Sequence, residues 1–182
     1  LARALAARGR YDDALRHSMA AVRLEPREAD FHHTLGHVYE RQGRYEHAAT
    51  SLGSFINLLP KGIADSRAVW AGSELKFLMS FGHKAPYEIT TNPDQLYTLP
   101  FRIENEKIIV SGRLNGSRPL DFVVDTGAEL TTISRVTGER QEVRPITYTV
   151  SAGVGEVGLR GLQLGRIDRL ELGALKMKNV PC

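Results

Sequence analysis

A repeat with a period of 34 residues opens the chain and limits what its first third can fold into. Four residues recur at this one spacing: Gly9 as Gly43, Tyr11 as Tyr45, Ala14 as Ala48, and Pro26 as Pro60. Periods of about 20 to 50 residues are typical of proteins in which small, similar units stack and bury one another's apolar faces. The start of the chain is therefore predicted to be a stack of such units.

The period and the residue types resemble the tetratricopeptide repeat (TPR), in which each unit is a pair of antiparallel helices. The positions of the second copy that match this pattern are Leu35, Gly36, Tyr39, Ala48, Phe55 and Pro60. Small Gly36 and Ala48 would let two helix backbones approach, while the aromatic residues fill the space beside them. The TPR-like region is expected to span residues 1–83, with residues 63–82 as a capping helix.

The first copy is incomplete. Leu1 lies 34 positions before Leu35, so the chain is expected to open partway through a first helix, and further repeats are expected to precede it. Repeat arrays of this kind present a concave face that binds peptide segments. The region is therefore expected to recruit a protein partner or a substrate.

The pattern changes after Gly82. Residues 83–100 hold three prolines among turn-forming Thr, Asn and Asp, which predicts an extended linker at 84–98. From Phe101 onward the apolar period becomes two, and Asn115-Gly116 is a strong hairpin signal. Residues 99–182 are predicted to be all-β, so the fold class is multidomain, α then β. Asn115-Gly116-Ser117 also fits a glycosylation acceptor, but the hairpin turn explains it.

Composition excludes several classes. The net charge is +3, only 7% of residues are aromatic, and no basic stripe carries interleaved aromatics, which argues against nucleic-acid binding. A single cysteine, Cys182, excludes an internal disulfide framework. No apolar run reaches the roughly 18 residues of a membrane span. The chain does not begin with Met, so an export signal is expected to have been lost with a preceding part, and localisation stays open.

The segment DFVVDTGAELTTIS, residues 121–134, carries the strongest chemical signal. Phe122–Val124 is predicted to be a buried strand that delivers Asp125 to a tight turn, and Leu130–Ile133 to resume as a strand. A carboxylate at the end of a buried strand is costly unless something there uses it. Asp125 is therefore the candidate catalytic residue, against the alternative of a solvated turn aspartate.

This segment resembles the active-site turn of the aspartic proteases, specifically the single-lobe retroviral (retropepsin-like) type. The resemblance covers residues 99–182 and implies that Asp125 is the catalytic carboxylate of a partial β-barrel. It also implies that Thr126, Gly127 and Ala128 support the turn. A flap over the substrate is expected at about residues 146–162, with its tip at Gly153, Val154 and Gly155.

Peptide hydrolysis by this route needs two carboxyls that share one proton, because one takes a proton from water while the other donates to the carbonyl oxygen. The chain holds one Asp-Thr-Gly; Asp121 and Asp168 are followed by other residues. A homodimer is therefore expected, each chain lending its Asp125. The function expected is an aspartic endopeptidase acting on protein or peptide without a cofactor. The alternative is a non-catalytic peptide-binding scaffold with a degenerate protease fold.

Two further patterns have ordinary explanations. Residues 153–158 spell G-x-G-x-x-G, but no helix is expected after them, so a glycine-rich hairpin tip is favoured over nucleotide binding. His33 and His37 stand one helical turn apart, yet no glutamate lies between them, and exposed helix histidines are favoured over a metal site. The apolar-apolar-Gly segment of retroviral-type proteases is not found before Cys182, so the domain is expected to lack its C-terminal part and to be poorly folded or inactive by itself.

Overall fold

The computed structural model describes residues 1–60, 66–128, 130–151 and 160–182. The chain forms two compact units, one of residues Leu1–Ala85 with Thr147–Leu162 and one of residues Pro86–Ile146 with Gln163–Cys182. Among the described residues, no helix has the length and apolar character needed to cross a membrane.

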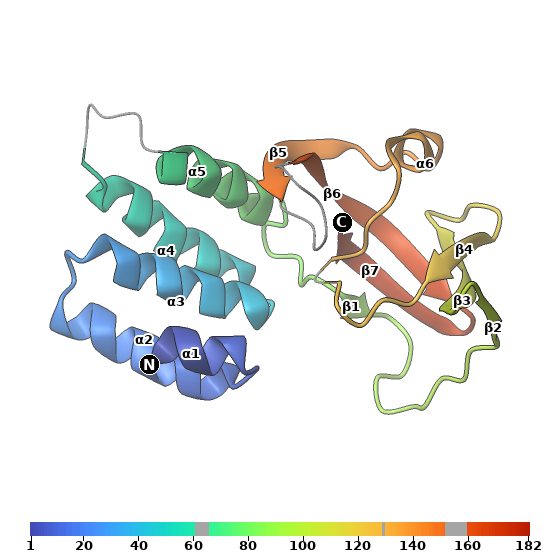
Figure 1. Cartoon of the computed structure of the whole chain (residues 1–182), viewed down its shortest axis with the longest axis horizontal. Coiled ribbons are helices and arrows are strands. Elements are labelled where there is room, and N and C mark those ends of the chain that lie inside the picture. Colours follow the sequence, from blue (N-terminus) through green and yellow to red (C-terminus); the bar gives the residue numbers. More distant parts are fainter. Residues whose placement is uncertain (61–65, 129, 152–159) are drawn as a thin grey trace. The chain divides into compact units, whose positions relative to one another are not determined.

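Five helices form the first unit in chain order (Figure 1). They are α1 (Ala2–Ala7), α2 (Tyr11–Leu24), α3 (Ala29–Arg41), α4 (Tyr45–Leu58) and α5 (Ser66–Met79). Successive helices pack against each other, so each buries an apolar stripe on the next. The helix pairs expected from the repeat are confirmed, and α5 follows them.

The two copies of the repeat share one backbone geometry. Gly9 and Gly43 have φ of 72° and 71°, and each ends a helix with its N–H bonded to the carbonyl three residues earlier. The residues after them, Arg10 and Arg44, have ψ of 64° and 65°. Positive φ is a conformation that glycine adopts without steric cost, which is why glycine recurs at this turn.

Gly36 and Ala48 mark the closest approach of α3 and α4. A Cβ at Gly36 would lie 3.3 Å from Leu52 Cγ and 3.4 Å from the Ala48 carbonyl oxygen. Ala48 is fully buried and Phe55 is 1% exposed. The packing expected from the repeat residues is therefore present.

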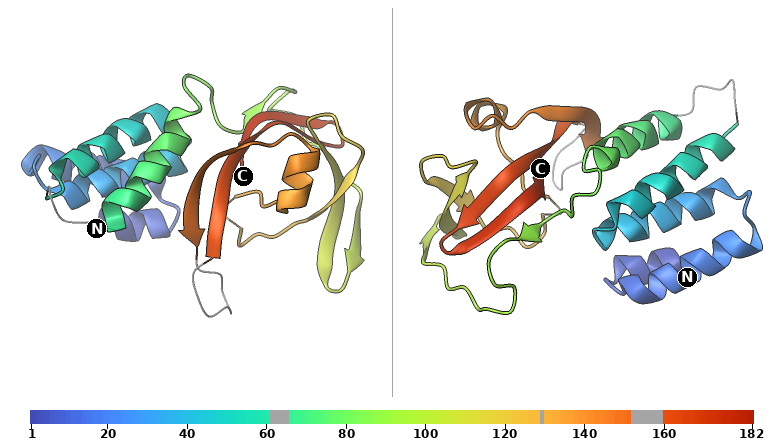
Figure 2. Two further views of the ribbon diagram at one scale, coloured as in Figure 1. Left: turned by 90° about the horizontal axis from the view of Figure 1, so that it is seen from above. Right: turned by 180° about the vertical axis from the view of Figure 1, so that it is seen from behind.

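The β region of the chain is built on a seven-stranded sheet (Figure 2). Its strands are β1 (Glu88–Ile89), β2 (Phe101–Glu104), β3 (Lys107–Leu114), β4 (Leu120–Val123), β5 (Pro145–Ser151), β6 (Arg160–Leu172) and β7 (Leu175–Pro181). The path runs β1-β7-β6-β3-β2, while β4 pairs with β3 and β5 with β6. Strand β1 lies within the predicted linker and pairs with β7 through Glu88 and Ile89.

The β3–β4 connection is the predicted hairpin turn. Asn115 and Gly116 have φ of 49° and 80°, and the Ser117 N–H donates to the Leu114 carbonyl at 2.8 Å. Two successive positive φ values define the turn that matches strand twist, and Asn-Gly is the sequence that adopts it best. The Asn115 amide also donates to the Gln141 carbonyl at 2.9 Å and accepts from the Arg169 N–H at 3.0 Å. The prediction of a hairpin is confirmed, and Asn115 holds structure at this turn.

A short helix, α6 (Arg135–Arg140), interrupts the β region and lies over one end of the curved sheet (Figures 1 and 2). Ser134 caps it, since its Oγ accepts from the Thr137 N–H at 3.1 Å. The expectation of a purely β second part is wrong at this helix. The core of the sheet is formed by Leu114, Ile167, Leu170 and Val180.

Candidate active site

The Asp-Thr-Gly turn directly follows β4. The Ala128 N–H donates to the Asp125 carbonyl at 3.2 Å and closes the turn, as predicted. The Gly127 N–H donates to Asp125 Oδ1 at 2.9 Å. The turn's own backbone thus fixes the direction of the carboxylate, as short polar side chains do in turns.

Gly127 lies against this carboxylate. A Cβ at that position would stand 3.3 Å from Asp125 Oδ1, tighter than ordinary van der Waals contact. Any larger side chain at position 127 would therefore crowd the carboxylate or displace it. Asp125 and Gly127 are both exposed in this chain.

An open hollow of about 820 Å³ borders the turn. Its floor is one face of the sheet, because Val110, Leu114, Leu120 and Phe122 share that face by register. A second wall comes from the segment that runs from the turn into α6, with apolar Leu130 and Ile133 and the hydroxyl-bearing Thr131, Thr132, Ser134 and Thr137. The hollow is also lined by Tyr87, Lys107, Leu170 and Leu172. The hollow thus offers apolar contacts and a few polar groups beside a fixed carboxylate, which is the usual character of a ligand site.

Arg102 forms ion pairs with two carboxylates, one of them on Asp121, four residues before Asp125. Its guanidinium bonds Glu104 Oε1 at 2.5 Å and Asp121 Oδ2 at 2.6 Å. The hydrogen bond from Arg102 lowers the pKa of Asp121, and the two carboxylates raise the pKa of Arg102. Asp121 is therefore an ionised, engaged carboxylate.

Comparisons with known families match both parts of the chain. The model of the aspartyl protease family matches residues 110–182, and that of the TPR repeat matches residues 2–52. The chain joins a TPR region to an aspartyl protease domain. No curated protein and no solved structure matches it.

The strand that leads to Asp125 in the protease domain differs from its prediction. Val123 and Val124 are 53% and 47% exposed, so the expectation of a buried Phe122–Val124 strand is wrong for the two valines. Within the described chain β4 pairs only with β3, which leaves its other edge without a neighbouring strand. A short apolar run predicts a strand but not which of its faces are covered.

The segment after the turn also differs. Residues 130–134 form no strand in the described structure, and Ser134 instead caps α6. A strand needs a neighbour to bond its backbone, and β5 follows only at Pro145. The prediction of a strand at Leu130–Ile133 is therefore wrong.

The predicted flap is described only in part. Its two sides belong to strands β5 and β6, which pair with each other. Residues 152–159, with the predicted tip at Gly153, Val154 and Gly155, lie outside the described residues. The chain continues as β6 from Arg160. A dinucleotide fingerprint requires a helix at this place, so strand β6 argues against that alternative.

The histidine pair of the TPR region is engaged in packing. His33 lies between the rings of Phe55, at 5.0 Å, and Trp70, at 5.4 Å, and burial lowers its pKa. His37 is exposed and stands 3.9 Å from Glu40. Within the described ranges, no group of three or more His, Cys, Asp or Glu could hold a metal ion. The expectation that both histidines are exposed is wrong for His33.

Three residues at the site escaped sequence reasoning. Arg102 and Lys107 lie in the region predicted to be β. The residues that stand beside each of them depend on strand register, which the sequence does not state. Ser134 could have been found, since serine is a preferred residue at the N-cap of a helix.

Proposed function

We propose that the protein is an aspartic endopeptidase of the retropepsin-like type, in which Asp125 from each of two chains activates a water molecule. The observation that carries the proposal is the fixed Asp125 carboxylate at the edge of a largely apolar hollow, inside a domain of the aspartyl protease family. Thr126, Gly127 and Ala128 would support the turn. No cofactor is required by this chemistry.

The chemistry follows from two carboxyls held about 3 Å apart, where mutual repulsion keeps one proton between them. The ionised member takes a proton from the attacking water as it adds to the peptide carbonyl. The protonated member donates to the carbonyl oxygen. Collapse of the tetrahedral intermediate then releases the amine, and the pair returns to its single-proton state.

A second chain would supply the second carboxyl. Among the described residues that line the hollow, the acids are Asp121 and Asp125, and Asp121 is engaged by Arg102. The described part of one chain therefore presents one carboxylate there, that of Asp125, which makes no ion pair. A two-fold pair of chains would bring two Asp125 turns together.

The substrate would be a protein or peptide bound in an extended form. Apolar Leu130 and Ile133 would contact its side chains, and the flap tip at Gly153, Val154 and Gly155 would fold over it. The TPR region would recruit the substrate or a partner protein. The proposed repeat region spans residues 1–83, the linker residues 84–98 and the protease domain residues 99–182.

The test compares Asp125→Asn with Asp121→Asn in the full-length chain. Peptide cleavage should favour acidic pH, and Asp125→Asn should lower kcat by about 1,000-fold with circular dichroism unchanged, since the carboxylate is the acid–base group. Asp121→Asn, four residues away on the same segment, should keep its activity. Cleavage that survives Asp125→Asn would refute the catalytic role. A folded wild-type chain that binds peptides without cleaving them would favour the non-catalytic scaffold.

A further inference from the structure

A lysine begins strand β3, whose ladder with β4 leads to the candidate catalytic aspartate. In the β3–β4 ladder Ile109 pairs with Val123, and the Val124 N–H donates to the Ile108 carbonyl at 2.9 Å. The pairing thus continues past the end of β4. Continued by one position, this register would set Lys107 beside Asp125, where the turn begins, on the face of Ile109 and Val123.

Lys107 also lines the hollow together with Asp125. It is the first residue of β3 and is exposed. Among the described residues that line the hollow, Lys107 is the only basic one. A cation therefore stands at the rim of the space in which a substrate would lie.

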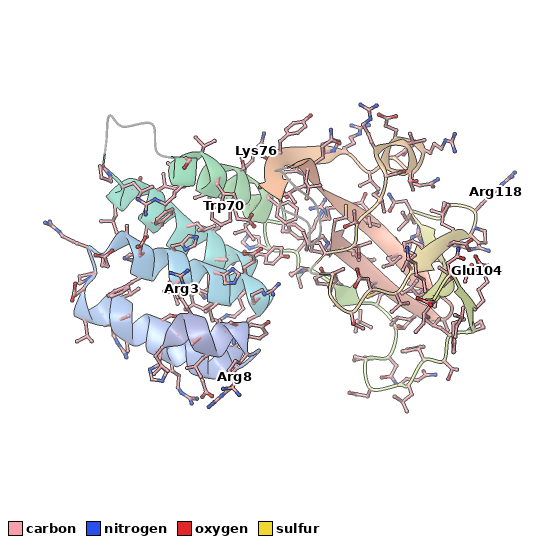
Figure 3. The ribbon with its side chains drawn as sticks, viewed as in Figure 1. Arg3, Arg8, Trp70, Lys76, Glu104 and Arg118 are labelled. Carbon is pink, nitrogen blue, oxygen red and sulfur yellow. The ribbon has the colours of Figure 1, made fainter. Side chains whose placement is uncertain are left out.

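The acids nearest to Lys107 in the ladder are already engaged. Glu104 is its direct partner on β2, yet its carboxylate bonds Arg102 at 2.5 Å. Asp121 bonds the same guanidinium as Glu104, which is labelled in Figure 3. Within the part of the chain that the structure describes, the Lys107 ammonium makes no ion pair or hydrogen bond. Its charge is available to a ligand.

We propose that Lys107 is a specificity-determining residue that receives an acidic side chain of the substrate close to the scissile bond. The proposal rests on the proposed function, since it places the substrate beside Asp125. A pair of catalytic carboxyls that holds one proton keeps one negative charge, which repels a nearby acidic side chain. The ammonium of Lys107 offsets this repulsion and adds an attraction of its own.

This electrostatic origin sets conditions on the preference. A substrate glutamate is charged only above about pH 4.3, so the preference should vanish at lower pH. An ammonium at an exposed site is screened by salt, so the preference should also decrease between about 0.05 and 0.5 M salt. Apolar contacts in the hollow would show neither dependence.

The experiment uses the full-length chain and pairs of peptides that differ only by Glu or Gln, with this residue moved through each position around the cleaved bond. At pH 5.5 we expect one position at which Glu is preferred by about fivefold in kcat/KM. Lys107→Met should reduce this ratio to about one. Arg113→Met is the matched control: Arg113 is an exposed cation on the same face of β3, and it does not line the hollow.

A reversed charge provides the second test. Lys107→Glu should transfer the preference to peptides with Lys at the same position, while Lys107→Arg should keep the preference for Glu. A Glu preference that persists in Lys107→Met, or that Arg113→Met removes equally, would overturn the proposal. So would a uniform loss of activity on both peptides with an unchanged ratio.

Peptide binding to the Asp125→Asn variant keeps the two proposals separate. Its affinity for Glu and Gln peptides reports on Lys107 without any cleavage, so the role of Lys107 is measured even if Asp125 is not a catalyst. Equal affinity for the two peptides at every position would refute the role of Lys107 and leave the protease proposal intact.

Discussion

Glu74 is a carboxylic acid buried between helices of the TPR region, and its charge should oppose the docking of α5. It is 9% exposed and shares a hydrogen bond with the side chain of Glu40. Burial raises the pKa of Glu74 above its ordinary value of 4.5, and the bond to Glu40 only partly offsets this. The folded state therefore holds a proton that the unfolded chain has already released.

The sign of the pH dependence follows from that difference. When the folded state binds more protons, the free energy of unfolding falls as pH rises. The contribution of Glu74 to stability should be greatest below pH 4.5 and should fall as pH rises through the higher pKa of folded Glu74. Above that range a charged Glu74 remains buried near Glu40. The uncompensated charge should cost about 1–3 kcal/mol.

Glu74→Gln tests this reasoning, because an amide keeps the shape, cannot ionise, and can donate to Glu40. We expect the variant to match the wild type near pH 4 and to exceed it by about 1–3 kcal/mol near pH 8. With an m-value of about 1–2 kcal/mol/M, the urea midpoint should rise by about 1 M. Trp70, the single tryptophan, lies one helical turn away on α5, so its fluorescence reports the transition (Figure 3).

Glu25→Gln is the control, because Glu25 is exposed at the end of α2. It should leave the pH dependence of the urea midpoint unchanged. If Glu74→Gln follows the same pH profile as the wild type, Glu74 is charged in the folded state at no cost, and the argument fails.

Two further substitutions test the packing of each unit. Phe55→Ala should destabilise the helical unit by roughly 3–5 kcal/mol in urea unfolding followed by Trp70 fluorescence, whereas Leu24→Ala, at an 82% exposed site, should change stability by less than about 0.5 kcal/mol. Asn115→Ala should destabilise the β unit by about 2–4 kcal/mol in hydrogen exchange of β3 and β4, because it removes two hydrogen bonds at 2.9 and 3.0 Å and a residue suited to φ of 49°. Asn115→Asp keeps the acceptor for Arg169, so a loss equal to that of alanine would contradict this account.

The helical part was predictable because its signal is local and repeated. Gly9 and Gly43 occupy equivalent turns, and a Cβ at Gly36 would crowd Leu52 and Ala48. Each of these residues acts within one unit or its neighbour. A period in the sequence therefore predicts which residues pack together in each unit.

The β part was predictable only where the signal was equally local. Asn115-Gly116 determined its turn because two positive φ values need those residue types. The existence of the strand was also predictable, but Val123 and Val124 continue an apolar run that is typical of a buried strand and are still half exposed. Coverage of a strand depends on which distant segment lies over it, and nothing in the strand's own residues specifies that segment.

The same distinction separates Asp125 from Lys107. Asp125 could be found from its sequence neighbours, because the turn that orients its carboxylate consists of the next three residues. Lys107 stands 18 positions earlier, and it lines the same hollow only because β3 pairs with β4. A site built by a turn is encoded in one stretch of sequence, whereas the charge that we propose selects its substrate comes from the neighbouring strand. Substrate preference can therefore change by substitution at Lys107 while the chemistry of the turn is retained.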